Sequence, residues 1–366
     1  MIIDKYEGSM SSRERVLCAM QHGTPDRVPI NYLTNVAVYE RLASALDIQK
    51  GDYEGVLKAL GVDFRSVEPV YTGPVLFNVP TGRKVDSVYG FVTRWIANKD
   101  GGYWDYCDFP LKDAISEVIA SFPIPNPDNF DYETAIEKIK RYSAEGYAVS
   151  IGNAGIADII NSTGRVMGME DTLVNLMFED DATLTYIDRR CAMELGVLGR
   201  LLDKANEHVT FVWMGEDLGT QKAPMISLDL YRSVIRPRHQ KYIDLAKFYD
   251  KPVMMHSCGS SSWAFPDFIE MGVDVVDTLQ PEAENMSPIY LKKTFGKRLS
   301  FHGCVSTAGP LAYGNAKETE DSVREILEIM MPGGGYLLSP THAIQDNTPV
   351  ENIIAMYNAA HKFGRY

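Results

Sequence analysis

His256 and Cys258 stand one residue apart in the segment KPVMMHSCGS, where an apolar run that predicts a β-strand comes to its end. Alternate side chains of a strand point to the same face, so the imidazole and the thiol can turn toward one point. Nitrogen and thiolate ligands suit zinc, and three protein ligands leave a fourth position open for a substrate atom. We therefore predict a catalytic zinc site; the alternative is that Cys258 is a small buried hydrophobic residue.

Further polar residues follow other predicted strands. A third zinc ligand has two candidates, His342 in LLSPTHAIQ and Cys304 in SFHGC, whereas His302 is expected to make a structural hydrogen bond. Glu216 and Asp217 in WMGEDLG are expected either to cap the following helix or to act in catalysis. Candidates for substrate binding at the same strand ends are Asn153, Gln280 and Glu282. The alternative for the two amides is that they only satisfy backbone groups.

Short apolar and β-branched runs predict the strands that would position these residues. The runs cover residues 28–32, 64–69, 148–152, 209–214, 252–256, 273–278, 298–303 and 335–338. Helical periodicity fills most of the intervals, for example 181–206, 227–250 and 318–331, with capping residues such as Ser227 and Thr319. Strands that alternate with helices pair in parallel, and eight such units predict a (β/α)8 TIM barrel, with its chemistry at the carboxyl ends of the strands.

One region interrupts the alternation. Between the second and third predicted strands, residues 70–110 are rich in glycine, proline and aromatic residues, with alternating runs between turn signals, as in hairpins. We interpret the whole interval 70–147 as an excursion that covers the barrel mouth. Residues 1–366 are then predicted to form a single barrel domain with an N-terminal extension.

Composition limits the classes of partner. The chain has 366 residues, 45% of them hydrophobic, and a formal net charge of −13, which argues against broad binding to nucleic acid or anionic membranes. No apolar run approaches the ~18 residues of a membrane span, and the start does not resemble a signal peptide. Five scattered cysteines predict reduced thiols. We expect a cytoplasmic protein whose partners are small molecules and other proteins. A homodimer is compatible with these features.

The stretches 11–30, 251–260, 272–307 and 333–364 together resemble the uroporphyrinogen decarboxylase superfamily, and more closely its corrinoid-dependent methyltransferase branch. The resemblance covers nearly the whole chain, is weakest over 70–147, and implies a (β/α)8 barrel. True decarboxylases carry an arginine-rich MRQAGRY segment after the first strand to hold the carboxylates of the substrate. The corresponding stretch here, INYLTNVAVYE, has no arginine before Arg41, which disfavours decarboxylation.

The methyltransferase branch binds zinc through a His-x-Cys pair and a third ligand near the last strand, commonly a cysteine. His256 and Cys258 match the pair, and SPTHAI places His342 at the third position, so the resemblance favours His342 over Cys304. Glu216, or with less support Glu282, would then supply a labile fourth ligand that the substrate displaces.

The resemblance implies zinc-dependent transfer of a methyl group between a small methylated donor, such as a methoxy compound, and a corrinoid. Because the chain has no DxHxxG cobalamin-binding motif, the methylcobalamin-type cofactor is expected on a separate corrinoid protein. Because His342 stands where the family commonly has a cysteine, the zinc site favours an oxygen atom of the substrate as its open ligand. This favours O-demethylation of the donor. Two alternatives stay open at this point: a decarboxylase of the uroporphyrinogen type and a non-catalytic barrel that binds a ligand.

Overall fold

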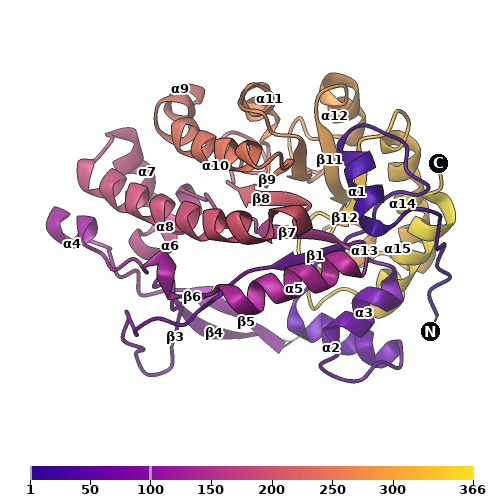
Figure 1. Cartoon of the computed structure of the whole chain (residues 1–366), viewed down its shortest axis with the longest axis horizontal. Coiled ribbons are helices and arrows are strands. Elements are labelled where there is room, and N and C mark those ends of the chain that lie inside the picture. The colour runs from indigo at the N-terminus through magenta and orange to yellow at the C-terminus, as the bar shows by residue number, and fades with distance from the viewer. Residues whose placement is uncertain (1, 99–100) are drawn as a thin grey trace.

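The architecture is a curled sheet of seven parallel strands with helices packed around its outside (Figure 1). The structure is a computed structural model that describes residues 2–98 and 101–366. The sheet has the order β1 (Phe64–Val67), β7 (Ala148–Gly152), β8 (Phe211–Gly215), β9 (Val253–Ser257), β10 (Val275–Thr278), β11 (Ser300–Val305) and β12 (Tyr336–Pro340). Each strand pairs in parallel with the next one along the chain. Both faces of these strands are covered, which explains why they read as nearly continuous apolar runs.

The segment predicted as the first strand, 28–32, joins the two edges of this sheet. Leu338 donates its N–H to Pro29 and accepts from Asn31, at 2.8 and 2.9 Å, and Ile30 accepts from Asp63 N–H just before β1. The segment is not a regular strand as predicted, because Pro29 has no N–H for a ladder. A parallel bridge between Ile30 and Leu338 remains, an arrangement consistent with a (β/α)8 barrel.

The other seven predicted strands are confirmed, although some of their ends differ. The strand at 148–152 has the predicted bounds. The strand predicted over 64–69 ends at Val67 instead, shortly before Pro69, which has no backbone N–H to donate. β11 continues to Val305 because Cys304 and Val305 still pair with β12. Backbone pairing between neighbours, which no local pattern records, decides these ends.

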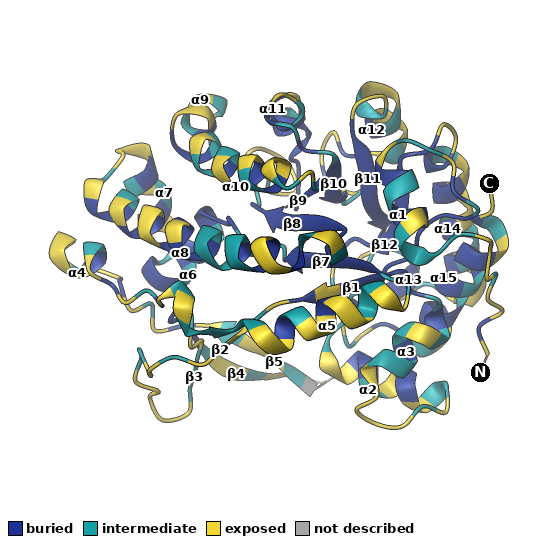
Figure 2. Cartoon of the chain, in the orientation of Figure 1, coloured by how far each residue is buried: buried dark blue, intermediate teal, exposed yellow. Residues whose placement is uncertain are grey.

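The helices that connect the strands cover the outside of the sheet. They are α5 (Tyr132–Ala144), α6 (Ile160–Met167), α7 (Met169–Met177), α8 (Asp181–Ala205), α9 (Leu228–Leu230), α10 (Arg236–Phe248), α11 (Phe265–Met271), α12 (Pro288–Phe295), α13 (Pro310–Tyr313), α14 (Ala316–Met330) and α15 (Val350–Phe363). Figure 2 shows the strands of the seven-stranded sheet as mostly buried and many of the helices as exposed on their outer sides. This burial pattern places the core between the sheet and the inner faces of the helices.

Two helix predictions were wrong in part, one at its beginning and one in its interior. Ser227 does cap α9, but α14 begins earlier than predicted, because Asn315 is its N-cap and forms a capping box with Glu318, while Thr319 lies inside the helix. The helix predicted over 227–250 is interrupted by a π-helical turn at Tyr231–Ile235, where Pro237 cannot donate the next backbone hydrogen bond.

The excursion leaves the sheet between β1 and β7, as predicted. It contains β2 (Val70–Tyr71), β3 (Lys84–Val85), β4 (Val92–Asn98), β5 (Gly101–Tyr106), α4 (Ser116–Ala120) and β6 (Phe130–Asp131). The strands form an antiparallel β3-β4-β5 sheet and a β2-β6 pair. The guanidinium of Arg165 in α6 lies 4.9 Å from the ring of Tyr106 and 5.5 Å from that of Phe91, which links the excursion to the main body.

The helix α1 (Ser12–Met20) lies across the amino ends of the strands. Residues 28–32, the closing segment, follow it, and then come α2 (Val36–Ala45) and α3 (Tyr53–Leu60). Arg13 N–H donates to Gly146 just before β7, and the hydroxyl of Ser300 in β11 donates to Ala19. This end of the sheet is therefore closed, and the strand carboxyl ends are left for a site. Within the described residues, no helix combines the length and apolar character that a bilayer crossing requires.

A buried ion-pair network fixes the closing segment to β1. Asp63 is fully buried and accepts from Arg15 and Arg27, each at 2.7 Å, and from Ile30 N–H at 2.8 Å. A carboxylate without water is stable only with such partners. Asp63 therefore connects α1, the closing segment and the start of β1.

Replacing Asp63 should strongly destabilise the fold. Asp63→Ala leaves two buried guanidinium groups without their shared partner, and we expect a loss of about 3–5 kcal/mol of unfolding free energy, measured by urea denaturation. The control is Asp321→Ala, since Asp321 forms exposed ion pairs with Lys317 and Arg324. That change should cost about 0–1 kcal/mol. Equal effects of the two substitutions would contradict the role assigned to Asp63.

Candidate metal centre

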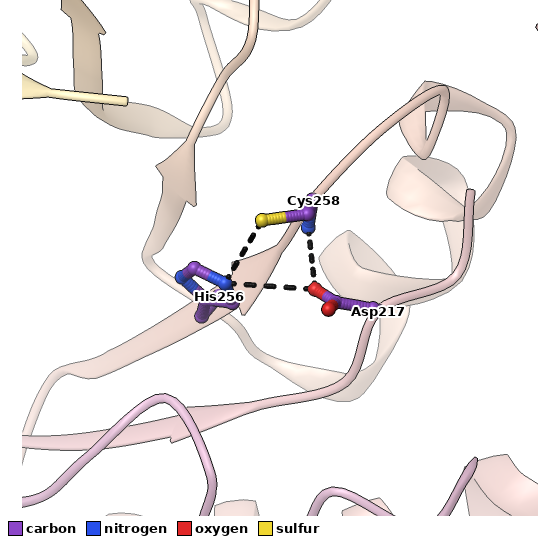
Figure 3. Close-up of side chains that lie close together, drawn as sticks. All are labelled: Asp217, His256 and Cys258. Carbon is purple, nitrogen blue, oxygen red and sulfur yellow. Dashed lines mark hydrogen bonds and ion pairs between the residues drawn. The ribbon is translucent and has the colours of Figure 1, made fainter. Parts of the chain in front are cut away.

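Three side chains from two neighbouring strand ends converge at the carboxyl end of the sheet (Figure 3). His256 lies in β9, Cys258 follows it, and Asp217 follows β8. The Nε2 atom of His256 lies 3.3 Å from Cys258 Sγ and 3.5 Å from Asp217 Oδ1. One ligand atom from each residue lies within 4.8 Å of the other two. The predicted convergence of the imidazole and the thiol is therefore present, and it includes a carboxylate.

Close contact between two loops brings Asp217 to Cys258. The backbones cross at Gly219 and Gly259, where a Cβ on Gly259, at φ +71°, would lie 2.1 Å from the carbonyl oxygen of Gly219. Glycine is required there for both conformation and space. As a result Cys258 N–H donates to Asp217 Oδ1 at 2.9 Å, and Asn161 Nδ2 holds the other oxygen at the same distance.

A buried carboxylate orients His256. Asp277 in β10 is fully buried, and its Oδ2 lies 2.7 Å from His256 Nδ1. The pairing register sets Asp277 directly beside His256, because the two residues are Cα partners in the parallel ladder. An imidazole that donates its Nδ1 hydrogen to a carboxylate presents the Nε2 lone pair, as metal-binding histidines do.

The electrostatics of the group favour ionised acids around one imidazole. Burial alone would raise the pKa of Asp217, but His256 and the donated N–H groups hold it well below its usual range. Burial alone would lower the pKa of His256, but Cys258, Asp217 and Asp277 raise it well above its usual range. Burial raises the pKa of the Cys258 thiol, and His256 partly offsets this. Two ionised carboxylates thus face one imidazole and favour its protonated form, and a metal ion bound here would take the place of that proton.

These donors fit a metal ion. They offer one nitrogen, one sulfur and one oxygen, which are the atoms that zinc binds in proteins, and the buried partner of His256 supplies the outer hydrogen bond that such sites have. The side chains of His256 and Asp217 are 16% and 30% exposed, so a small molecule can reach them.

The two candidates for a third ligand lie in different surroundings. His342 is exposed, lines the same cavity as His256 and Cys258, and has its Nδ1 3.1 Å from the carbonyl oxygen of Ala343. It is not among the three side chains that converge within 4.8 Å, so its role as a ligand stays a prediction. Cys304 is fully buried in β11 and also outside that group, and burial raises the pKa of its thiol.

Glu216 lies behind the site as a buried cap. Its carboxylate oxygens accept from the N–H groups of Ile159 and Ile160, at 2.7 and 3.1 Å, at the start of α6. Burial raises the pKa of Glu216 to about 7, partly offset by hydrogen bonds from Asp158 and these amides. Of the two acids predicted as catalytic, the structure therefore brings Asp217 to His256 and Cys258. Glu216 caps α6, which precedes it in the chain, and not the following helix as the alternative had predicted.

The predicted substrate-binding residues are separated. Asn153 lines the cavity and its amide donates to Glu68. Gln280 instead accepts from Gly259 N–H at 2.8 Å, which supports the loop of Cys258, and Glu282 accepts from the hydroxyl of Ser306. Among the described residues only Asn153 of these three lines the cavity of His256.

Sequence reasoning did not select several residues of the site. Asp158, Asn161 and Arg165 line the cavity from the segment around α6, after a strand end whose loop drew attention only to Asn153. Asp277 was also missed, although an acid inside the apolar run VDVVDT is a signal, because a buried carboxylate needs a partner.

Part of the chain matches a known protein family, and its fold resembles that of a solved structure. Residues 204–363, which include His256, Cys258 and His342, match the family model described as uroporphyrinogen decarboxylase (URO-D). A methyltransferase from Methanosarcina mazei has a similar structure, with a TM-score of 0.66 and 15% identity over 97% of this chain and 99% of that one. No curated protein matches the sequence. Over residues 204–363, the family match confirms the predicted resemblance to the uroporphyrinogen decarboxylase family, and the structural likeness confirms the fold.

A weaker structural likeness is also found. A B12-independent methionine synthase from Shewanella sp. W3-18-1 has a TM-score of 0.38 and 11% identity, over 62% of this chain and 64% of that one.

Loss of either member of the pair should remove the metal. In His256→Ala and Cys258→Ser we expect most zinc to be lost while the fold is retained, because each variant removes a ligand atom at the accessible strand end. The measurements are zinc content by elemental analysis and circular dichroism. Cys304→Ser is the matched control and should keep its zinc. Near-normal zinc in both variants of the pair would rule out this site.

The third ligand can be tested in the same way. Asp217→Asn should weaken zinc binding more than His342→Ala, because only Asp217 is held against His256 and Cys258 in the structure. His342→Ala should in turn exceed Cys304→Ser, since His342 lines the cavity. Zinc affinities measured by chelator competition give the order of the three variants. If Cys304→Ser loses the most zinc affinity, the site lies in the sheet interior.

Proposed function

We propose that the chain is a zinc-dependent methyltransferase that moves a methyl group between a small methylated donor and a corrinoid on a separate protein. The observation that carries the proposal is the group of His256, Cys258 and Asp217 in a cavity at the strand carboxyl ends. The family match and the structural likeness to a methyltransferase add support. A closed (β/α)8 barrel is part of the same proposal.

In this proposal His256, Cys258 and Asp217 hold the zinc ion, with His342 in reach of the same cavity. Bound zinc would supply Lewis acidity toward a heteroatom of the donor, such as a methoxy oxygen. The protein contributes the orientation of the ligands: Asp277 fixes the imidazole, and Asn161 and Cys258 N–H fix the carboxylate. A ligand set held in this way has little rearrangement to make when a substrate enters.

The chain also offers a source for the proton that a demethylated oxygen needs. Asp158 lines the cavity beside Glu216, and burial together with that second carboxyl group raises the pKa of Asp158 well above its usual range. Two acids so close cannot both ionise readily, so the pair retains a proton. Arg165 lies 3.7 Å from Asp158 and adds a positive charge at the cavity wall.

Decarboxylation of a porphyrinogen is the second candidate, because the matched family model bears that name. A substrate with many carboxylates requires several cations. Among the described residues that line the cavity, Arg165 is the one arginine or lysine, and the segment from Asn31 to Glu40 adds none. A third candidate, a barrel that only binds a ligand, would not require the metal group.

The activities separate these functions. With cob(I)alamin, zinc and a set of small methoxy compounds, we expect a change in the cobalt absorption spectrum that requires enzyme, zinc and donor together. Cys258→Ser should abolish the change, and Cys304→Ser should retain it. If the spectrum changes equally with the Cys258→Ser variant, the pair does not carry the reaction.

Uroporphyrinogen should not be converted. Each missing charge-assisted contact costs about 1.5–3 kcal/mol, so the loss of two weakens recognition by a factor on the order of 100 or more. Product formation is measured by fluorescence after oxidation to the porphyrins. Efficient turnover would overturn the methyltransferase proposal in favour of the decarboxylase.

A further inference from the structure

Asp277 holds a second histidine besides His256. Its Oδ1 atom lies 2.6 Å from Nδ1 of His302 in β11, and the ladder register makes Asp277 the Cα partner of both histidines. Asp277 and His302 are fully buried. The Nε2 atom of His302 lies 3.1 Å from Nδ2 of Asn31 in the closing segment. A row of four polar side chains thus crosses the interior from the closing segment to the metal group.

The hydrogen bonds of Asn31 determine the protonation of His302. Tyr32 N–H donates to Asn31 Oδ1 at 2.8 Å, which fixes the oxygen end of the amide and turns the nitrogen end toward His302. An amide nitrogen can only donate, so Nε2 of His302 must accept. The imidazole is then neutral and carries its hydrogen on Nδ1, which donates to Asp277.

The same reasoning passes through Asp277 to the metal group. One carboxylate oxygen is filled by a neutral imidazole donor, so Asp277 remains an ionised acceptor, and its other oxygen takes the Nδ1 hydrogen of His256. Nε2 of His256 is thereby the nitrogen that faces Cys258 Sγ and that would bind a metal ion once its own proton is displaced. We infer that His302 and Asn31 are positioning residues for metal binding at His256, an inference that rests on the zinc site proposed above.

A purely structural role explains this row poorly. Polar side chains in a barrel interior are stabilising only when each is satisfied, and apolar residues of similar volume would fill the space without that requirement. Every member here has a partner, and the row ends at the partly exposed imidazole of His256. Because Asn31 belongs to the segment that joins β12 to β1, closure of the sheet and orientation of the metal ligand depend on the same contacts.

The experiment measures binding of Co²⁺ alone, which replaces zinc and reports thiolate and imidazole ligands by visible absorption. His302→Phe keeps a ring but removes the donor to Asp277, and should lower Co²⁺ affinity by roughly 10–100-fold, the usual effect of an outer-shell partner. His302→Gln retains an amide donor and should recover most of the affinity. His361→Gln is the matched control, since His361 is also buried but bonds to the carbonyl oxygen of Leu60 at the end of α3.

A second measurement needs no substitution. Nitrogen-15 NMR of the wild-type imidazoles should show His302 and His256 with hydrogen on Nδ1, and Asn31→Leu should alter the signals of His302. These results decide the question even where His302→Phe fails to fold.

The outcomes are distinguishable. Equal Co²⁺ affinities in wild type, His302→Phe and His361→Gln, or a hydrogen on Nε2 of His302, would overturn this inference while leaving the metal site intact. A wild-type protein that binds no Co²⁺ would overturn the proposed zinc site, and the inference with it.

Discussion

The site depends on one buried carboxylate, that of Asp277, which accepts from imidazoles on both neighbouring strands. Parallel pairing makes this arrangement possible, because residues in register on β9, β10 and β11 present side chains to the same interior face. A charge without access to water must be compensated, and here the compensation is two N–H donors. The consequence is directional: His256 can offer only its outward nitrogen.

Backbone closure serves the same end. The segment with Asn31 lacks a regular ladder, yet Asp63 and Leu338 hold it at both sides, and from there the amide of Asn31 reaches His302. The amino ends of the strands are covered by α1. The row of Asn31, His302, Asp277 and His256 therefore ends at the carboxyl side of the sheet, which is left open. The contacts that close the sheet are thus linked through Asn31 and His302 to the side chains at its carboxyl end.

Two loops bring Asp217 and Cys258 to His256 at the end of β9. Gly219 and Gly259 let two backbones approach more closely than any Cβ permits, and this approach delivers Asp217 to Cys258. Asp217 arrives already hydrogen-bonded on both oxygens, and burial is offset by those donors. A centre of this kind combines a rigid strand residue, His256, with two loop residues whose exposure lets a substrate approach.

The sequence by itself determined the alternation of strands and helices, seven of the eight strands, and the pair His256 and Cys258, because these follow from local periodicity and spacing. It also indicated the superfamily. Tertiary structure decided which distant residues meet the pair. Asp217 joins it, whereas Cys304 is buried elsewhere. Glu216, the sequence neighbour of Asp217, turns away to cap a helix. Adjacent residues can face opposite sides of a strand end, and only pairing register and loop contacts determine which side meets a partner.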